Sequence, residues 1–257
     1  MLDKMIHQKE FRLRIMLTDF CNMSCENCLN EFQPKGVMYK NANYASPGKV
    51  MILIRDYVSF CEGMNIKPVV SFTGGEPGFH PYFIQIIDYA KKFKNLKIQV
   101  NTNGIVDNLY WDRNGVDIRY HVGPDLLNPI MEGQTAVFVV KEPSTINEVI
   151  DFLTPFHLGG MKIKTFADFH SREHFLDTIY PYMIEEINKC FPVSGRFTGK
   201  QINRGDGCYN CEKRCITLKA LWMFPDNTYS PCPQRRLFFK KILTPETMFS
   251  AYNFHLA

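Results

Sequence analysis

Short runs rich in β-branched and aromatic residues alternate with longer amphipathic stretches along most of the chain. Six runs have the length and composition of strands. They lie at residues 11–17, 68–72, 96–101, 117–122, 135–140 and 161–166. A repeated order of strand, helix and strand is typical of βαβ units around a parallel sheet. Six such repeats predict an α/β fold, a partial (β/α)6 TIM-like barrel.

Amphipathic stretches with helical spacing lie between these strands. They occupy residues 46–65, 80–95 and 145–157, with a further long one at 171–190. Ser46 is a suitable N-cap residue, and Pro47 suits the first helical position. The connections at 102–115 and 123–133 have room for only a turn or two of helix, because Asn-Gly and other turn residues flank them.

The composition changes near the end of the last helix. A stretch rich in Gly and polar residues follows, and the chain becomes rich in cysteine from Cys208 onward. We therefore expect a barrel domain at 1–195 and a small module at 196–257. Within this module, apolar residues flank Pro-Asp-Asn, which predicts a β-hairpin turning at Asp226–Asn227, since Asn tolerates the left-handed conformation of such turns.

Composition narrows the class of protein. Of 257 residues, 45% are hydrophobic and 22% are charged, as in globular proteins. The net charge of +4 is compatible with anionic ligands such as phosphates, but it falls short of the strong basic patches of nucleic-acid-binding proteins. No secretory signal is visible at the N-terminus, and no apolar run approaches the ~18 residues of a membrane span. A cytoplasmic protein without membrane or nucleic-acid partners is expected.

Three of the nine cysteines, Cys21, Cys25 and Cys28, directly follow the first predicted strand. Ligand sites of parallel α/β sheets form at the carboxyl ends of strands. Three thiolates on one loop are able to hold three corners of an iron–sulfur cube and leave the fourth iron open. The spacing alone also permits a zinc site with a remote fourth ligand, or three unrelated thiols.

A second motif, Ser-Phe-Thr-Gly-Gly-Glu-Pro, ends the second predicted strand. Gly74 and Gly75 allow close backbone approach and unusual backbone dihedral angles. Glu76 offers a carboxylate, and Pro77 opens the next turn. Alone, the motif is also compatible with an ordinary turn before a helix.

Together, these two motifs closely resemble the radical SAM (S-adenosylmethionine) superfamily, over roughly residues 11–166. The resemblance implies that the three cysteines bind a [4Fe–4S] cluster, whose fourth iron is chelated by the amine and carboxylate of SAM. It assigns the contact with the methionyl group of SAM to Gly74, Gly75, Glu76 and Pro77. It also places a segment beside the SAM site at Asn101, Thr102 and Asn103.

Two positions depart from the family pattern. Asn27 stands where the family usually has an aromatic residue near the adenine. On the fourth strand, where the family often has a ribose-binding serine, His121 is the candidate, although a hydrogen-bonded structural histidine is the alternative.

The family chemistry implied is the reductive cleavage of SAM to a 5′-deoxyadenosyl radical, which takes a hydrogen atom from the substrate. An electron donor such as flavodoxin or ferredoxin would supply the electron. We expect a peptide or amino-acid-derived substrate. The alternatives are a small-molecule dehydrogenase or cofactor-biosynthesis enzyme, an RNA-modifying enzyme and, in another class, a non-catalytic zinc or iron–sulfur protein.

Four further cysteines lie on either side of the predicted hairpin strand, at Cys208, Cys211, Cys215 and Cys232. Their arrangement resembles the auxiliary-cluster modules, called SPASM or twitch domains, that follow many radical SAM barrels. The resemblance implies a second [4Fe–4S] cluster that aids electron transfer or substrate binding. A structural zinc ion is the alternative.

The remaining candidates are single residues. Cys61 is predicted to be a buried core thiol, and Cys190 a structural residue at a helix end. The string from His170 to His174 matches a metallopeptidase pattern, but no third ligand is evident. It is instead a candidate for substrate contact through His170 or Arg172, as are Arg119 and Asp125.

Overall fold

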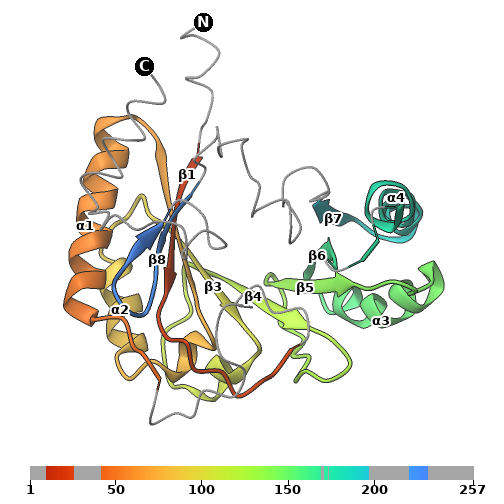
Figure 1. The fold of residues 1–257 in the computed structure, drawn as a ribbon, viewed down its shortest axis with the longest axis horizontal. Coiled ribbons are helices and arrows are strands. Elements are labelled where there is room, and N and C mark those ends of the chain that lie inside the picture. Colours follow the sequence, from red (N-terminus) through yellow and green to blue (C-terminus); the bar gives the residue numbers. More distant parts are fainter. Residues whose placement is uncertain (1–9, 26–41, 169–170, 173, 197–219, 231–257) are drawn as a thin grey trace, which may run out of the picture. The chain divides into compact units, whose positions relative to one another are not determined.

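The computed structural model describes residues 10–25, 42–168, 171–172, 174–196 and 220–230. Its strands are β1 (Glu10–Met16), β2 (Lys67–Thr73), β3 (Lys97–Thr102), β4 (Val116–Val122), β5 (Thr135–Val140), β6 (Lys162–Ala167), β7 (Val193–Arg196), β8 (Ala220–Met223) and β9 (Tyr229–Ser230). They form one sheet in the order β7-β6-β5-β4-β3-β2-β1-β8-β9 (Figure 1). The predicted parallel α/β fold of the partial-barrel type is confirmed, since the neighbouring strands pair in parallel and only β9 pairs antiparallel.

The helices follow the strands in the predicted order. They are α1 (Pro47–Gly63), α2 (Phe83–Ala90), α3 (Ile146–Leu158) and α4 (Tyr180–Cys190), with short turns η3 (Pro77–Phe79), η4 (Ile105–Asn108) and η5 (Phe175–Ile179). α1 begins at Pro47 after Ser46, as predicted, although the Ser46 side chain makes no capping hydrogen bond. α3 begins with a capping box, in which Thr145 and Glu148 each accept a hydrogen bond from the other's backbone N–H. None of the described helices is long and apolar enough to cross a membrane.

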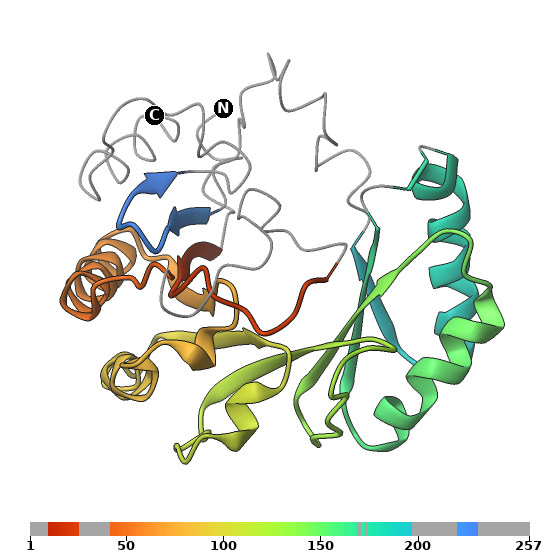
Figure 2. The same ribbon diagram turned by 60° about the horizontal axis from the view of Figure 1, so that its bottom comes forward.

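The chain divides into two compact units. The first contains β1, β2, β3 up to Asn101, β8, β9, α1 and α2. The second contains β4 from Ile118 onward, β5–β7, α3 and α4. Within each unit the two helices lie next to each other against the strands (Figure 2). In the first unit, the buried Tyr57 hydroxyl of α1 donates to the Val69 carbonyl of β2 at 3.1 Å and accepts from the Val69 N–H at 2.9 Å. In the second unit, the hydroxyls of Thr165 on β6 and Tyr180 on α4 share a buried hydrogen bond of 2.9 Å.

The predicted C-terminal hairpin is present as β8 and β9. Asn227 adopts a φ of +63°, and its N–H donates to the Phe224 carbonyl at 2.8 Å. β8 also pairs in parallel with β1, and Trp222 packs with Met16 and Phe224 in a small buried cluster. The pairing with β1 was not expected, because the sequence assigned the hairpin to a separate module. The proposed module at 196–257 otherwise lies largely outside the described residues.

A seventh parallel strand, β7, follows α4 and pairs with β6. The sequence predicted no strand there, because these residues belong to the stretch rich in Gly and polar residues that follows the last helix. The strand is only four residues long and contains Ser and Gly, which have low strand propensity. The strand therefore forms because it pairs with β6, and its own sequence does not favour a strand.

Candidate active site at the ends of the first strands

Backbone hydrogen bonds join the cysteine-bearing segment to the Gly-Gly-Glu-Pro segment. The Leu17 N–H donates to the Thr73 carbonyl at 2.8 Å, just beyond the paired residues of β1 and β2. The N–H of Gly75 then donates to the Thr18 carbonyl at 2.7 Å, and that of Glu76 to the Phe20 carbonyl at 2.8 Å. Cys21 is the next residue in the chain. The two motifs, which lie some fifty residues apart in the sequence, are therefore bonded to each other at the carboxyl ends of their strands.

The two glycines are required by this close approach. Gly74 has a φ of +142°, and a Cβ atom on it would lie 2.4 Å from the Thr18 carbonyl oxygen. A Cβ atom on Gly75 would lie 1.9 Å from the Phe20 carbonyl oxygen. Neither distance is tolerable for a carbon atom, and the obstacle in both cases is backbone. The close approach predicted from the sequence is thus made by the protein's own cysteine segment.

The chain returns to the same place after the cysteine segment. Thr18 forms an isolated antiparallel bridge with Tyr44, and the Ala45 N–H donates to the Leu17 carbonyl at 2.8 Å. The Asp19 carboxylate accepts hydrogen bonds from the backbone N–H of Asn43 at 2.7 Å and from its side-chain amide at 2.5 Å. The loop that carries the cysteines is therefore closed at its base by both backbone and side-chain bonds.

His80 anchors this return segment and was not identified from the sequence. It is 3% exposed, its Nε2 lies 2.9 Å from the Ala45 carbonyl oxygen, and its Nδ1 lies 3.1 Å from the Tyr82 N–H. Nδ1 must accept a hydrogen bond, so Nε2 carries the single ring proton. Burial lowers the pKa of His80, which favours this neutral form. Its position three residues after Pro77 was the only signal in the sequence.

Two of the three predicted cluster ligands lie among the described residues. Cys21 is half-buried and Cys25 is exposed, and neither forms a disulfide. The Met23 N–H donates to the Cys21 sulfur at 3.4 Å. Two cysteine sulfurs on one loop fit an iron–sulfur cluster, for which thiolates are the preferred ligands. Cys28 and Asn27 lie outside the described residues, so the third ligand and the departure from the aromatic pattern are not tested.

Glu76 and Pro77 form the next turn. The Glu76 side chain is 1% exposed, and its carboxylate accepts from the Gly78 N–H at 3.2 Å, which caps η3. Phe79 of this turn packs edge-on against Phe20, with ring centroids 4.8 Å apart. The carboxylate is thus held beside the cysteine segment. Whether these residues contact the methionyl group of SAM stays a prediction.

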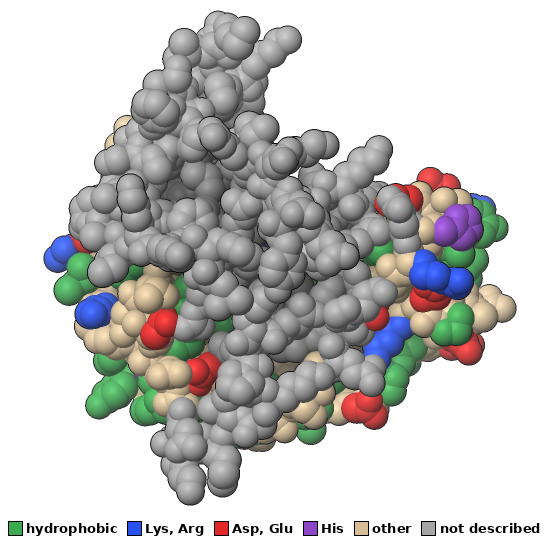
Figure 3. Space-filling model, in the orientation of Figure 1, with side chains coloured by type: hydrophobic (Ala, Val, Ile, Leu, Met, Phe, Trp, Pro, Cys, Tyr) green, Lys and Arg blue, Asp and Glu red, His purple; other side chains and the backbone are tan. Residues whose placement is uncertain are grey.

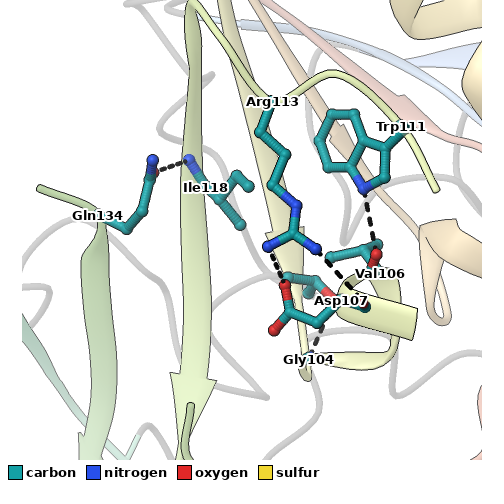
Figure 4. Close-up of polar contacts among 8 residues, drawn as sticks. Gly104, Val106, Asp107, Trp111, Arg113, Ile118 and Gln134 are labelled. Carbon is teal, nitrogen blue, oxygen red and sulfur yellow. Dashed lines mark hydrogen bonds and ion pairs between the residues drawn. The ribbon is translucent and has the colours of Figure 1, made fainter. Parts of the chain in front are cut away.

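The segment after β3 is fixed by side-chain contacts in both units. In the first unit, the Asn101 amide donates to the Ser71 hydroxyl at 2.8 Å. Also in that unit, Trp111 donates to the Val106 carbonyl at 3.1 Å, and Arg113 pairs with Asp107 at 2.9 Å around η4 (Figure 4).

In the second unit, the Thr102 hydroxyl accepts from the Gly104 N–H at 3.0 Å, and Asn103 between them is half-buried. The Gln134 side chain accepts from the Ile118 N–H at 2.7 Å at the start of β5 (Figure 4). Side-chain hydrogen bonds therefore hold Asn101 and Thr102 in this segment. The position of the segment at 101–103 beside SAM remains a prediction.

His121 lies on β4 in the second unit. It is half-buried, and desolvation lowers its pKa to about 4, with further contributions from the nearby Lys164 and Arg119. The side chain is therefore neutral at pH 7. Its assigned contact with the SAM ribose is untested. Asp125, one of the candidate substrate contacts, is exposed in the connection after β4.

The remaining single-residue candidates lie at different positions in the fold. Cys61 is fully buried in α1, and burial raises the pKa of its thiol to about 12, as suits a core residue. Cys190 is exposed at the end of α4. The Arg172 guanidinium pairs with Glu142. His170 and the four C-terminal cysteines, Cys208, Cys211, Cys215 and Cys232, lie outside the described residues.

Named relatives match part of the chain. A GTP 3′,8-cyclase of Vibrio vulnificus is 28% identical over 130 residues, which are 49% of this chain and 36% of the relative. The molybdenum cofactor biosynthesis protein 1 of Homo sapiens is 35% identical over 95 residues, 36% of this chain and 14% of the relative. A probable GTP 3′,8-cyclase of Methanosarcina mazei is 30% identical over 178 residues, 66% of this chain and 51% of the relative. The chain thus spans about half or less of the length of these proteins.

Solved structures share the fold. SuiB of Streptococcus suis, bound to the precursor peptide SuiA, matches with a TM-score of 0.63 and 12% identity over 98% of this chain and 66% of that chain. SuiB bound to S-adenosylmethionine matches with a TM-score of 0.57 and 12% identity over 95% of this chain and 62% of that chain. At such low identity, the likeness concerns the fold alone.

The family model described as the radical SAM superfamily matches residues 15–153, more than half of the chain. This range contains the cysteine segment, the Gly-Gly-Glu-Pro segment and the bonds between them. The protein therefore belongs to the radical SAM superfamily.

Proposed function

We propose that this protein is an enzyme that holds a [4Fe–4S] cluster through Cys21, Cys25 and Cys28 and binds SAM at the cluster's open iron. The backbone pairing between the Thr18–Phe20 segment and Gly75–Glu76 carries the proposal. It brings both family motifs to one place, and Cys21 and Cys25, which form no disulfide, follow directly in the chain.

When bound, the cluster and SAM supply the electron and the 5′-deoxyadenosyl group that takes a hydrogen atom from the substrate. Within the chain itself, backbone hydrogen bonds join residues 17–19 to residues 43–45 at the base of the cysteine loop. Gly74 and Gly75 admit the backbone of the cysteine segment, while Asp19 and His80 fix the segment that returns from it. Such fixed surroundings orient the reacting groups and help to exclude water from them.

The substrate class is a second part of the proposal. The sequence alone favoured a peptide or amino-acid-derived substrate, and the likeness to SuiB concerns only the fold. The relatives at 28–35% identity bear the names of a GTP cyclase and a molybdenum cofactor biosynthesis protein, which supports the small-molecule alternative. We therefore place a small molecule of a cofactor-biosynthesis pathway first and a peptide second.

Two accessory features complete the proposal. A low-potential donor such as flavodoxin or ferredoxin would reduce the cluster.

The four C-terminal cysteines would hold a second [4Fe–4S] cluster, with structural zinc as the alternative. Iron remaining at about four per chain after Cys21, Cys25 and Cys28 are changed to Ala would support the second cluster. Zinc at one per chain in that variant, with no iron, would favour the structural zinc site.

The proposed activity is tested by anaerobic reconstitution followed by incubation with dithionite and SAM. We expect 5′-deoxyadenosine and methionine from the wild type, and none from the variants Cys21→Ala, Cys25→Ala and Cys28→Ala. Cys61→Ala is a matched control, because that thiol is buried in α1, and it should retain the activity. A fully reconstituted wild type that forms no 5′-deoxyadenosine would refute the proposal.

A further inference from the structure

A hydrogen bond joins the C-terminal hairpin to the segment that returns from the cysteine loop. The Ser46 backbone N–H donates to the Asn227 side-chain oxygen at 3.0 Å, although the two residues are 181 positions apart in the sequence. Both belong to the first unit, in which Figures 1 and 2 show the hairpin, drawn in blue, beside β1 and α1. The hairpin turn therefore bonds to the chain directly after Ala45, where the base of the loop is closed.

Separate parts of the sequence bond to residues 43–46. One is the segment at 17–19, which is joined to residues in this range by backbone hydrogen bonds and leads to Cys21. Another is His80, whose ring donates to the Ala45 carbonyl at 2.9 Å. The C-terminal hairpin adds a further bond. The segment next to the proposed cluster ligands is therefore held by parts of the chain that are far apart in the sequence.

The hairpin turn holds Asn227 through bonds that do not involve its side chain. Asn227 adopts a φ of +63°, and its N–H donates to the Phe224 carbonyl at 2.8 Å. The Phe224 N–H in turn donates to the Thr228 carbonyl at 2.9 Å. Phe224 also belongs to the buried cluster that contains Met16, the last residue of β1. The turn thus holds the side-chain oxygen of Asn227 against Ser46 and does not need that side chain for its own shape.

This internal bond indicates more than the charges on the surface do. The face in Figure 3 carries both basic and acidic side chains among its described residues, so charge on that face does not select a ligand. Ser46 and Asn227 are both half-buried, so water competes only partly for their hydrogen bond. The loss of one such bond typically makes local opening about fivefold more favourable.

We propose that Asn227 is a positioning residue for the proposed cluster: its side chain fixes Ser46 and thereby the segment that closes the cysteine loop. This inference rests on the proposed function, because it assumes that Cys21 and Cys25 hold a cluster. It gives the C-terminal hairpin a role in retaining that cluster. The role does not depend on which metal the four C-terminal cysteines bind.

An asparagine at a positive φ allows a substitution that removes the acceptor and keeps the turn. Asn227→Gly is such a change, because glycine adopts a positive φ readily. Asn227→Asp keeps an acceptor oxygen in the same position, and Asp also tolerates this backbone conformation. Asn65→Gly is the matched control. It is the same substitution at a φ of +53°, just beyond the opposite end of α1 from Ser46.

The first measurement is the rate at which the anaerobically reconstituted full-length protein loses iron to a chelator. Iron that the triple variant Cys21→Ala, Cys25→Ala, Cys28→Ala still holds is subtracted, so that only the proposed SAM-binding cluster is followed. We expect Asn227→Gly to lose this iron about fivefold faster than the wild type, as for the loss of one hydrogen bond. Asn227→Asp and Asn65→Gly should lose it at the wild-type rate. Equal rates in Asn227→Gly and the wild type, or loss from Asn227→Asp as fast as from Asn227→Gly, would overturn the inference.

Hydrogen exchange of the same proteins, followed by mass spectrometry, separates positioning from a simple loss of the hairpin. In Asn227→Gly the backbone amides of residues 43–46 should exchange about fivefold faster, while those of β8 should exchange as in the wild type. Faster exchange in β8 as well would overturn the inference, because the hairpin itself would then have unfolded.

A third measurement needs no substitution in the hairpin. Energetic coupling between two sites is reciprocal, so the loss of the cluster should also loosen the hairpin turn. Residues 43–46 and 224–228 should exchange faster in the triple cysteine variant than in the reconstituted wild type. Unchanged exchange in either segment would overturn the inference.

The proposed function is judged separately, by 5′-deoxyadenosine formation. If the wild type forms this product while Asn227→Gly retains its iron as well as the wild type does, the function stands and the inference fails. If the wild type forms no 5′-deoxyadenosine, the function fails, and the hydrogen exchange of residues 43–46 still shows whether Asn227 holds that segment.

Discussion

At the scale of single residues, the backbone of Gly75 is the most constrained position of the candidate active site. Its N–H bonds to Thr18, and the Phe20 carbonyl oxygen fills the space where a Cβ atom would be. In Gly75→Ala the cysteine segment must move, because the obstacle is backbone and no flexible side chain can turn away. We expect the reconstituted variant to lose most of the roughly four irons per chain that the loop at 21–28 would hold, measured together with sulfide.

The matched control for this change is Gly48→Ala in α1. A Cβ atom on Gly48 would meet nothing within 4 Å, and alanine is the better helix former. Iron content should therefore equal that of the wild type. Equal iron in Gly75→Ala and Gly48→Ala would show that the close approach of the two segments does not matter for the cluster.

His121 gives a pH-dependent prediction at the same scale. Its pKa is lowered to about 4 in the folded protein, chiefly by desolvation and then by Lys164 and Arg119, whereas an ordinary histidine has a pKa near 6.5. The unfolded chain therefore binds the proton first as the pH falls. The contribution to stability is present above about pH 6.5 and is lost progressively as the pH falls toward 4.

Urea unfolding of the wild type and His121→Gln between pH 7.5 and 4 measures this contribution. The free energy of unfolding should fall more steeply with decreasing pH in the wild type, since other groups titrate equally in both proteins. Parallel curves would mean that His121 is not desolvated.

Much of the residue-scale site could be predicted from the sequence, because the chemistry depends on residue type. The cysteines and the glycine pair can be recognised in the sequence by their residue type and spacing alone. The reason for the glycines could not be predicted, since Phe20 and Gly75 meet only after the strands pair. Asp19, Asn43 and His80 were missed for the same reason: each bonds to a partner more than twenty residues away in the sequence, which no local pattern indicates.

At the scale of elements, α3 depends on its N-terminal capping box. The Thr145 hydroxyl accepts from the Glu148 N–H at 3.3 Å, and the Glu148 carboxylate accepts from the Thr145 N–H at 2.7 Å. Thr145→Ala removes half of this pair and should lower the free energy of unfolding by about 1 kcal/mol.

Thr154→Ala is the control within the same helix. Its hydroxyl donates to the Ile150 carbonyl, four residues earlier in the helix, at 2.7 Å. Such a bond contributes little to helix stability, and alanine has a higher helix propensity than threonine. Denaturant unfolding at one pH should place this variant within about 0.5 kcal/mol of the wild type. A larger loss in Thr154→Ala than in Thr145→Ala would contradict the role of the cap.

The elements that the sequence predicted well are those with a local signal. α1, α3 and the hydrophobic strands β2, β4 and β5 carry their own periodicity, and the turn at Asn227 carries its own turn residue. β7 has no such signal, because Val193–Arg196 is short and is ordered by β6. The pairing of β8 with β1 joins residues about two hundred positions apart, which no local pattern encodes.

At the scale of the whole molecule, the observed parallel α/β fold is the one that the family resemblance predicted. The parallel strand order brings the ends of β1 and β2 together, and the family match covers both. The sequence predicted this arrangement because two motifs with known roles followed two strands in order. The substrate class could not be predicted in the same way, since candidates for substrate contact such as Arg119 and Asp125 are residue types that also serve many structural roles.

The central claim is that the Cys21–Cys28 loop holds a cluster with an iron open to SAM. The electron paramagnetic resonance spectrum of the dithionite-reduced, reconstituted protein, recorded with and without SAM, tests it most directly. The account predicts that SAM changes the signal of the reduced cluster in the wild type, and that the triple variant Cys21→Ala, Cys25→Ala, Cys28→Ala shows no SAM-dependent change. A reduced wild-type cluster whose signal is the same with and without saturating SAM would contradict the account.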